Sequence, residues 1–124
     1  MKRVVIFFCQ NLSYNKEEIF KVLDFPSEIS IRLMPIPCSA EISVGFLLKI
    51  LETDIDAIFI LACPVTSCQF GKGSIRAKKK VAYIQKILDE LGLGKDKLGV
   101  FEVDNSENLQ QIGRNIKKRC LSIT

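Results

Sequence analysis

The chain has 124 residues, of which 48% are hydrophobic and 26% are charged, and its net charge is +4. This composition excludes a disordered chain, and no apolar run approaches the roughly 20 residues that cross a membrane. Such a mild charge gives no indication of a nucleic-acid partner. The apolar run that ends at Cys9 is not followed by the cleavage site of a signal peptide. We therefore expect a cytoplasmic protein with no membrane partner.

Strands and helices are predicted to alternate along the whole chain, which we interpret as one domain over residues 1–124. In chain order we predict a strand over 2–8, a helix over 15–25, a strand over 29–36, a helix over 39–54, a strand over 56–63, a helix over 75–94, a strand over 97–104 and a helix over 105–120. The first and third strands are apolar throughout, as in strands buried on both faces. The second alternates apolar and polar residues, which is typical of an edge strand.

The helices carry apolar residues at helical spacing, and several have recognisable ends. We expect Ser39 to cap the second helix and Gly92 and Gly94 to end the third. The predicted buried stripes are Ile19, Phe20 and Leu23 in the first helix, a face that starts at Ile42 in the second, Ala77, Val81, Ile84, Leu88 and Leu91 in the third, and Leu109, Ile112 and Ile116 in the fourth.

Four consecutive βα units predict an α/β fold with three layers, in which helices cover both faces of a four-stranded parallel sheet. The two fully apolar strands belong in the middle of that sheet. The predicted strand order is therefore 2-1-3-4, as in a shortened flavodoxin-like or Rossmann-like fold.

Four of the five cysteines are predicted to gather at one edge of this sheet. Cys9 ends the first strand, Cys38 follows the second, Cys63 ends the third, and Cys68 lies in the next connection. The carboxyl ends of parallel strands share one edge, where such sheets bind ligands. Cys120, near the end of the last helix, is expected to lie away from this edge.

With no histidine in the chain, any metal at this edge must be held mainly by thiolates. The spacing between Cys63 and Cys68 matches neither a usual zinc pair nor a CxxC redox pair, and it suits an iron–sulfur cluster held by separate loops. Three alternatives stay open. The cysteines could be small buried residues in a cluster-free binding or scaffold domain, they could hold a structural zinc ion, or one of Cys63 and Cys68 could be a catalytic thiol.

The segments "FCQNLSY", "PCSAEI", "ACPVTSCQF" and "GSIRAKKKVAYIQKILDELG" resemble segments of one family, the delta subunit of methyl-viologen-reducing hydrogenase. The resemblance runs from about Phe7 to Glu107. It implies a non-catalytic electron-transfer subunit whose cysteines hold a 2Fe–2S cluster. It also implies that electrons pass from a hydrogenase-type donor to a heterodisulfide reductase-type acceptor.

Carried over residue by residue, the resemblance makes Cys9, Cys38, Cys63 and Cys68 the cluster ligands, and Ser13 and Tyr14 also match. The chain departs from the family at several positions. The second cysteine of the family's CxxC is Leu12, its preceding tryptophan is Asn11, the His-Pro-Gly-Asp between the last two cysteines is residues 64–67, and the last histidine is Gln69. Four cysteines remain, which is the number that a 2Fe–2S cluster requires.

Basic residues gather at the start of the third predicted helix, at Arg76, Lys78, Lys79 and Lys80. Positive charge at a helix start opposes the helix dipole, so helix stability does not explain it. These side chains could dock an acidic partner or offset the charge of a cluster, or they could form an ordinary solvated face.

Overall fold

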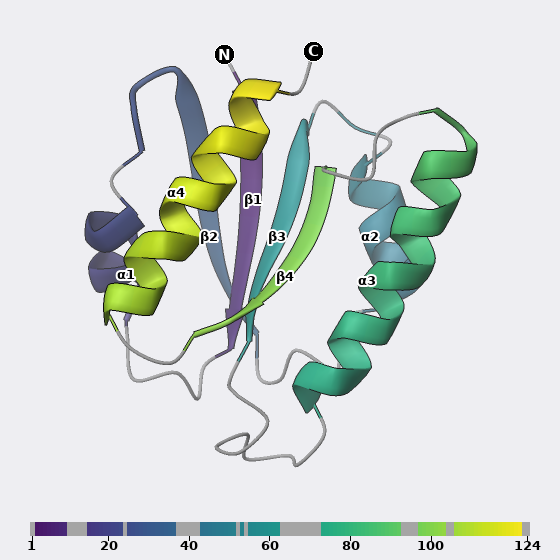
Figure 1. Cartoon of the computed structure of the whole chain (residues 1–124), viewed down its shortest axis with the longest axis horizontal. Coiled ribbons are helices and arrows are strands. Elements are labelled where there is room, and N and C mark those ends of the chain that lie inside the picture. Colours follow the sequence, from purple (N-terminus) through teal and green to yellow (C-terminus); the bar gives the residue numbers. More distant parts are fainter. Residues whose placement is uncertain are drawn as a thin grey trace.

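The computed structural model of the chain describes residues 2–9, 15–23, 25–36, 43–51, 53, 55–62, 73–92, 97–103 and 106–122. Its elements are β1 (Lys2–Cys9), α1 (Lys16–Leu23), β2 (Ile29–Ile36), α2 (Val44–Leu51), β3 (Ala57–Ala62), α3 (Gly73–Glu90), β4 (Leu98–Glu102) and α4 (Ser106–Ser122) (Figure 1). All three strand pairs are parallel, and the strand order is β2-β1-β3-β4. The predicted α/β fold and strand order are therefore confirmed.

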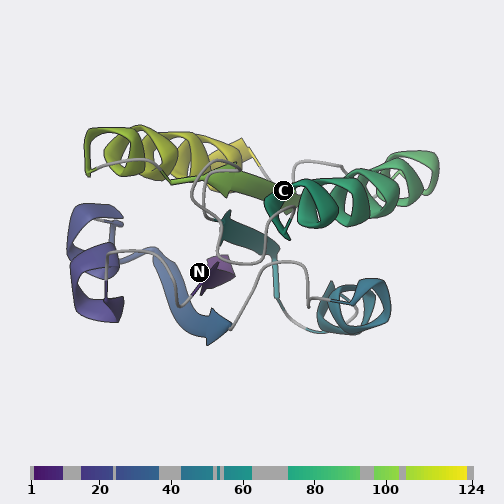
Figure 2. The ribbon, with the colours of Figure 1, turned by 90° about the horizontal axis from the view of Figure 1, so that it is seen from below.

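Helices cover both faces of the sheet, with α1 and α4 on one side and α2 and α3 on the other (Figure 2). Two separate hydrophobic cores result because side chains alternate between the faces of a strand. The α1/α4 core contains Val4, Ile6, Phe8, Ile19, Leu23, Ile29, Leu33, Ala57, Phe59, Leu61, Val103, Leu109, Ile112, Ile116 and Cys120. The α2/α3 core contains Val5, Phe7, Leu47, Ile58, Ile60, Val81, Ile84, Leu88 and Leu98.

The two central strands are apolar throughout because each faces both cores. Every residue of β3 is buried, and so is β1 from Val4 to Cys9. At the amino ends of these strands, the backbone N–H of Arg3 donates to the Asp56 carboxylate at 2.7 Å and the backbone N–H of Asp56 donates to the Arg3 carbonyl at 2.8 Å. This pair aligns β1 with β3. Strand β2 is half exposed, as predicted for an edge strand.

The helix ends follow local capping rules, with one correction. Asn15 caps α1 through a reciprocal pair with Glu18, in which the backbone N–H of Glu18 donates to Asn15 Oδ1 at 2.8 Å. Helix α2 begins at Val44, and its cap is Ser43, whose Oγ accepts from the backbone N–H of Phe46 at 3.0 Å. The prediction that Ser39 caps this helix was therefore wrong. Both serines precede the apolar run, and the sequence alone favoured the earlier one.

The apolar stripes are confirmed except at two positions. Phe20 is 55% exposed, because it lies at the rim of α1, and Leu91 is 66% exposed, because it follows the last residue of α3. Gly92 ends that helix with a φ of 72°, a conformation that glycine adopts without strain. The predictions for Ile42 and Gly94 lie outside the described residues, as does the side chain of Ala77.

Candidate functional site

The carboxyl ends of β1, β2 and β3 lie side by side at the lower edge of the sheet in Figure 1. Cys9, the last residue of β1, is paired with Ile36, the last residue of β2. Phe8 is paired with Leu61, so the same register brings Cys9 level with Ala62, the last residue of β3. The sheet therefore ends evenly at the strand positions from which the predicted ligands follow.

Cys9 is 2% exposed. Its side chain shares a face with Val5 and Phe7, since alternate residues of a strand point the same way. The Phe7 ring contacts the ring of Phe46 in α2, with 5.9 Å between their centroids. By strand alternation, the Cys9 thiol lies on the sheet face whose core, formed with α2 and α3, contains Val5 and Phe7.

The two connections that lead into α2 and α3 carry the other predicted ligands. Cys38 lies between β2 and α2, and Cys63 and Cys68 lie between β3 and α3. These three cysteines are outside the described residues, so of the predicted ligand set only Cys9 is described. Within the described ranges, no group of three or more cysteine, aspartate or glutamate side chains is arranged to hold a metal ion.

Cys120 is remote from Cys9 in two respects. It is fully buried in the α1/α4 core, on the opposite face of the sheet. It also lies near the end of α4, which reaches the edge where β1 begins (Figure 1). The expectation that Cys120 lies away from the carboxyl edge is confirmed.

One of the predicted basic residues has a partner that the sequence did not indicate. Lys78 Nζ lies 2.9 Å from a carboxylate oxygen of Glu102, the last residue of β4. The side chains are 48% and 28% exposed, so the pair is worth at most about 1 kcal/mol. Lys79 is exposed and Lys80 is half-buried, whereas the side chain of Arg76 is not described. Lys78 thus links the first half of α3 to the carboxyl end of β4.

The comparison with protein families matches residues 4–120 to the family "Methyl-viologen-reducing hydrogenase, delta subunit". The chain belongs to this family. None of the helices that the structure describes is long and apolar enough to cross a membrane.

Relatives of two kinds are similar to this member of the delta-subunit family. The iron-sulfur subunit of the vhu F420-non-reducing hydrogenase of Methanococcus maripaludis is 24% identical over 104 residues, which cover 84% of this chain and 78% of the relative. The iron-sulfur subunit of the vhc F420-non-reducing hydrogenase of Methanococcus voltae is 28% identical over 96 residues, which cover 77% and 67%. One subunit of the Ferredoxin:CoB-CoM heterodisulfide reductase of Methanosarcina mazei is 27% identical over 104 residues, 84% of this chain but 13% of the relative.

Proposed function

We propose that this chain is an electron-transfer subunit that holds a 2Fe–2S cluster on Cys9, Cys38, Cys63 and Cys68. It relays electrons from a hydrogenase-type donor to a heterodisulfide reductase-type acceptor, in the cytoplasm. The observation that carries the proposal is the buried position of Cys9 at the carboxyl edge, on the strand face that it shares with Val5 and Phe7 of the α2/α3 core. Relatives named as iron-sulfur subunits of hydrogenases support the cofactor class.

The donor set suits the proposed cofactor. A 2Fe–2S cluster takes four thiolates, and four cysteines follow or end the three strands that meet at this edge. Cys63 directly follows Ala62 in the sequence, and Cys38 is two residues after Ile36. Neighbouring strands are about 4.8 Å apart, so the strand ends that Cys9 forms and that Cys38 and Cys63 follow are close together.

An iron–sulfur cluster, when bound, accepts and releases single electrons. The described residues would position and shield it. β1 fixes the depth of Cys9, and the buried Phe7 ring, which contacts Phe46, fills the layer beneath it. Electron transfer of this kind requires no general acid or base, which agrees with a chain that contains no histidine.

The partner classes rest on two kinds of relative. The vhu relative is named as part of a hydrogenase. In the heterodisulfide reductase relative, the matched segment is a small part of a longer chain, so a domain like this one is covalently joined to a reductase subunit there. We infer that this chain contacts the same kind of reductase subunit.

The decisive experiment measures iron, acid-labile sulfide, zinc and the visible spectrum of protein purified without oxygen. We expect a coloured protein with equal amounts of iron and sulfide, bleached by a chemical reductant. Replacing Cys63 or Cys68 by serine should remove the colour, and Cys120→Ser should retain it. A colourless protein with one zinc ion per chain would establish the structural zinc alternative. A protein that stays metal-free after reconstitution would leave the scaffold and catalytic-thiol alternatives, and Leu12 at a family cysteine position is the feature that favours loss of the cluster.

The relay itself is tested separately with the loaded protein. Purified heterodisulfide reductase should be reduced faster by a hydrogenase-type donor when this chain is present than when it is absent. A loaded chain that accepts electrons but does not accelerate that reaction would contradict the relay and leave the cluster assignment intact.

A further inference from the structure

The outer edge of β2 carries backbone groups that lack a neighbouring strand. β2 is the edge strand, and among the described residues no strand lies beyond it. The backbone N–H of Ile29 donates to the Pro26 carbonyl at 3.1 Å, so it points away from β1. Backbone groups alternate in direction along a strand, so those of Ile31 and Leu33 also point outward. Pro35 occupies another outward-pointing position, so the absence of its N–H removes no hydrogen bond to β1.

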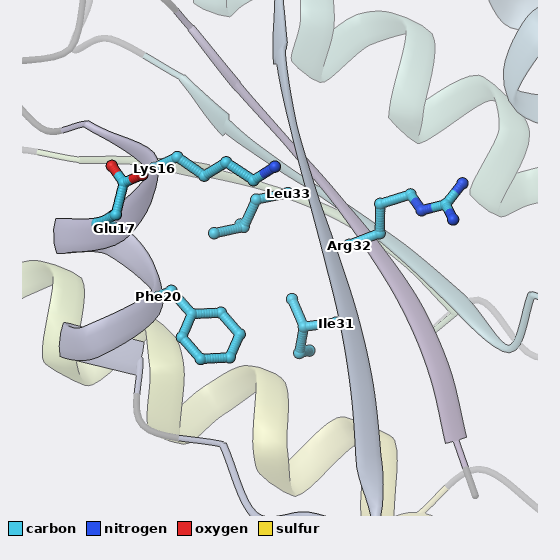
Figure 3. Close-up of a pocket in the computed structure, with 6 residues that line it drawn as sticks. All are labelled: Lys16, Glu17, Phe20, Ile31, Arg32 and Leu33. Atoms are coloured by element: carbon cyan, nitrogen blue, oxygen red, sulfur yellow. The ribbon is translucent and has the colours of Figure 1, made fainter.

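Two grooves flank this edge, one on each face of β2. The first has a volume of about 510 Å³ and lies between α1 and β2, where Ile31 and Leu33 point toward α1 and Phe20 and Lys16 point toward β2 (Figure 3). The second has a volume of about 550 Å³ and lies between β2 and α2. Arg32 lines both grooves, and Figure 3 shows its side chain directed away from α1. The second groove is lined by Val5, Arg32, Met34, Phe46, Lys49, Ile50, Thr53 and Ile55.

The grooves combine exposed apolar side chains with positive charge. Phe20, Met34 and Phe46 are 55%, 38% and 47% exposed, and they are three of the five large apolar residues exposed in the described part of the chain. The described lining residues of the two grooves include three cations, Lys16, Arg32 and Lys49, and one carboxylate, Glu17. Charged side chains alone are enough to protect an edge strand from aggregation. The exposed apolar side chains beside β2 are not explained by that protection.

We propose that the outer edge of β2 binds an extended segment of a partner protein, which adds a fifth strand to the sheet. The segment alternates apolar residues with aspartate or glutamate. Its backbone pairs with the outward groups of Ile31 and Leu33. Its apolar side chains enter the two grooves, while its carboxylates meet Lys16, Arg32 and Lys49.

A second copy of this chain is a poorer occupant of the same edge. Two β2 strands related by a two-fold axis at mid-strand would bring their Arg32 side chains opposite or diagonal to each other. Like charges in that arrangement are destabilising. Charge complementarity therefore favours an acidic segment from a different protein.

The test uses the 124-residue chain labelled with ¹⁵N and a library of ten-residue peptides. The peptides alternate Val, Ile, Leu or Phe with Asp or Glu, and a matched library has Lys in place of the acidic residues. We expect acidic peptides to slow amide exchange at Ile31 and Leu33 and to leave the amide of Arg32, which points toward β1, unchanged. Binding by neither library, or binding without protection of these two amides, would overturn the proposal.

Variants separate strand addition from nonspecific charge attraction. Arg32→Glu should raise the dissociation constant of the acidic peptides about tenfold or more, whereas Lys86→Glu on the exposed face of α3 should leave it unchanged. Ile31→Pro should abolish binding without removing a bond to β1. An equal effect of Arg32→Glu and Lys86→Glu would refute the edge site, as would dimerisation of the chain through β2. Metal-free protein should give the same result, so this test is independent of the cluster.

Discussion

Replacing Cys9 by alanine separates a ligand role from simple burial. If Cys9 is a ligand, it makes two contributions to stability. Its packing contribution is always present, and its ligand contribution is present only while the cluster is bound. As a buried small residue, it contributes the same packing energy with or without iron. Cys120 is the matched control, because it is also buried but lies on the other face of the sheet.

The size of the packing effect follows from burial. Cys9 is 2% exposed and Cys120 is fully buried, and cysteine to alanine removes one heavy atom from each site. Removing one buried heavy atom, as in isoleucine to valine, typically costs about 0.5–1.5 kcal/mol. Both variants should therefore lose about that much unfolding free energy in the metal-free protein. A larger, cluster-dependent loss is expected only for Cys9→Ala, since a ligand that binds only the folded state adds to its stability.

The assay is urea unfolding followed by circular dichroism without oxygen, on loaded and metal-free protein, together with the iron content. Loading should stabilise the unmodified chain and Cys120→Ala equally, and it should fail to stabilise Cys9→Ala. Full iron content and an undiminished gain on loading in Cys9→Ala would refute the assignment of Cys9 as a ligand.

Three further substitutions test the packing and capping by urea unfolding. A Cβ atom on Gly113 would lie 3.1 Å from Leu23 Cδ2 and 3.3 Å from the Leu23 backbone. In Gly113→Ala, overpacking should lower the unfolding free energy by about 1–3 kcal/mol, and the higher helix propensity of alanine should offset about 1 kcal/mol of that loss. Gly45→Ala, with no atom within 4 Å, should gain up to about 1 kcal/mol, and equal gains at both sites would contradict this packing. Asn15→Ala should lose about 1 kcal/mol, and unchanged stability would argue against the cap of α1.

The sheet could be predicted because a strand that is buried on both faces appears in the sequence as a continuous apolar run. β1 and β3 contain no polar residue between Val4 and Cys9 or between Ala57 and Ala62, so they had to be central. Hydrophobic periodicity was less reliable at the margins of the helices. The periodicity assigns Phe20 and Leu91 to the buried stripes of their helices. It does not reveal that the core leaves both side chains exposed.

The candidate site could be predicted only in part. The end of an apolar strand located Cys9 at the carboxyl edge, which the structure confirms. The roles of Cys38, Cys63 and Cys68 remain predictions. The ion pair between Lys78 and Glu102 joins residues 24 positions apart, and no local pattern indicates such a contact. The two grooves beside β2 also could not be predicted, because they form only where α1 and α2 meet that strand.

The strand order determines which face of the sheet α2 and α3 cover, and the position of Cys9 within β1 places its thiol on that same face. The connection from β1 to β2 runs in one direction across the sheet, and those from β2 to β3 and from β3 to β4 run in the other. Right-handed crossovers therefore put α2 and α3 together on the face opposite α1. Cys9 shares that face because it is two residues after Phe7, and a shift of one residue would turn the thiol toward α1 and α4. The connections that lead into α1 and α4 contain no cysteine, whereas those that lead into α2 and α3 contain three. The observed register therefore turns Cys9 toward the face whose helices follow the cysteine-containing connections.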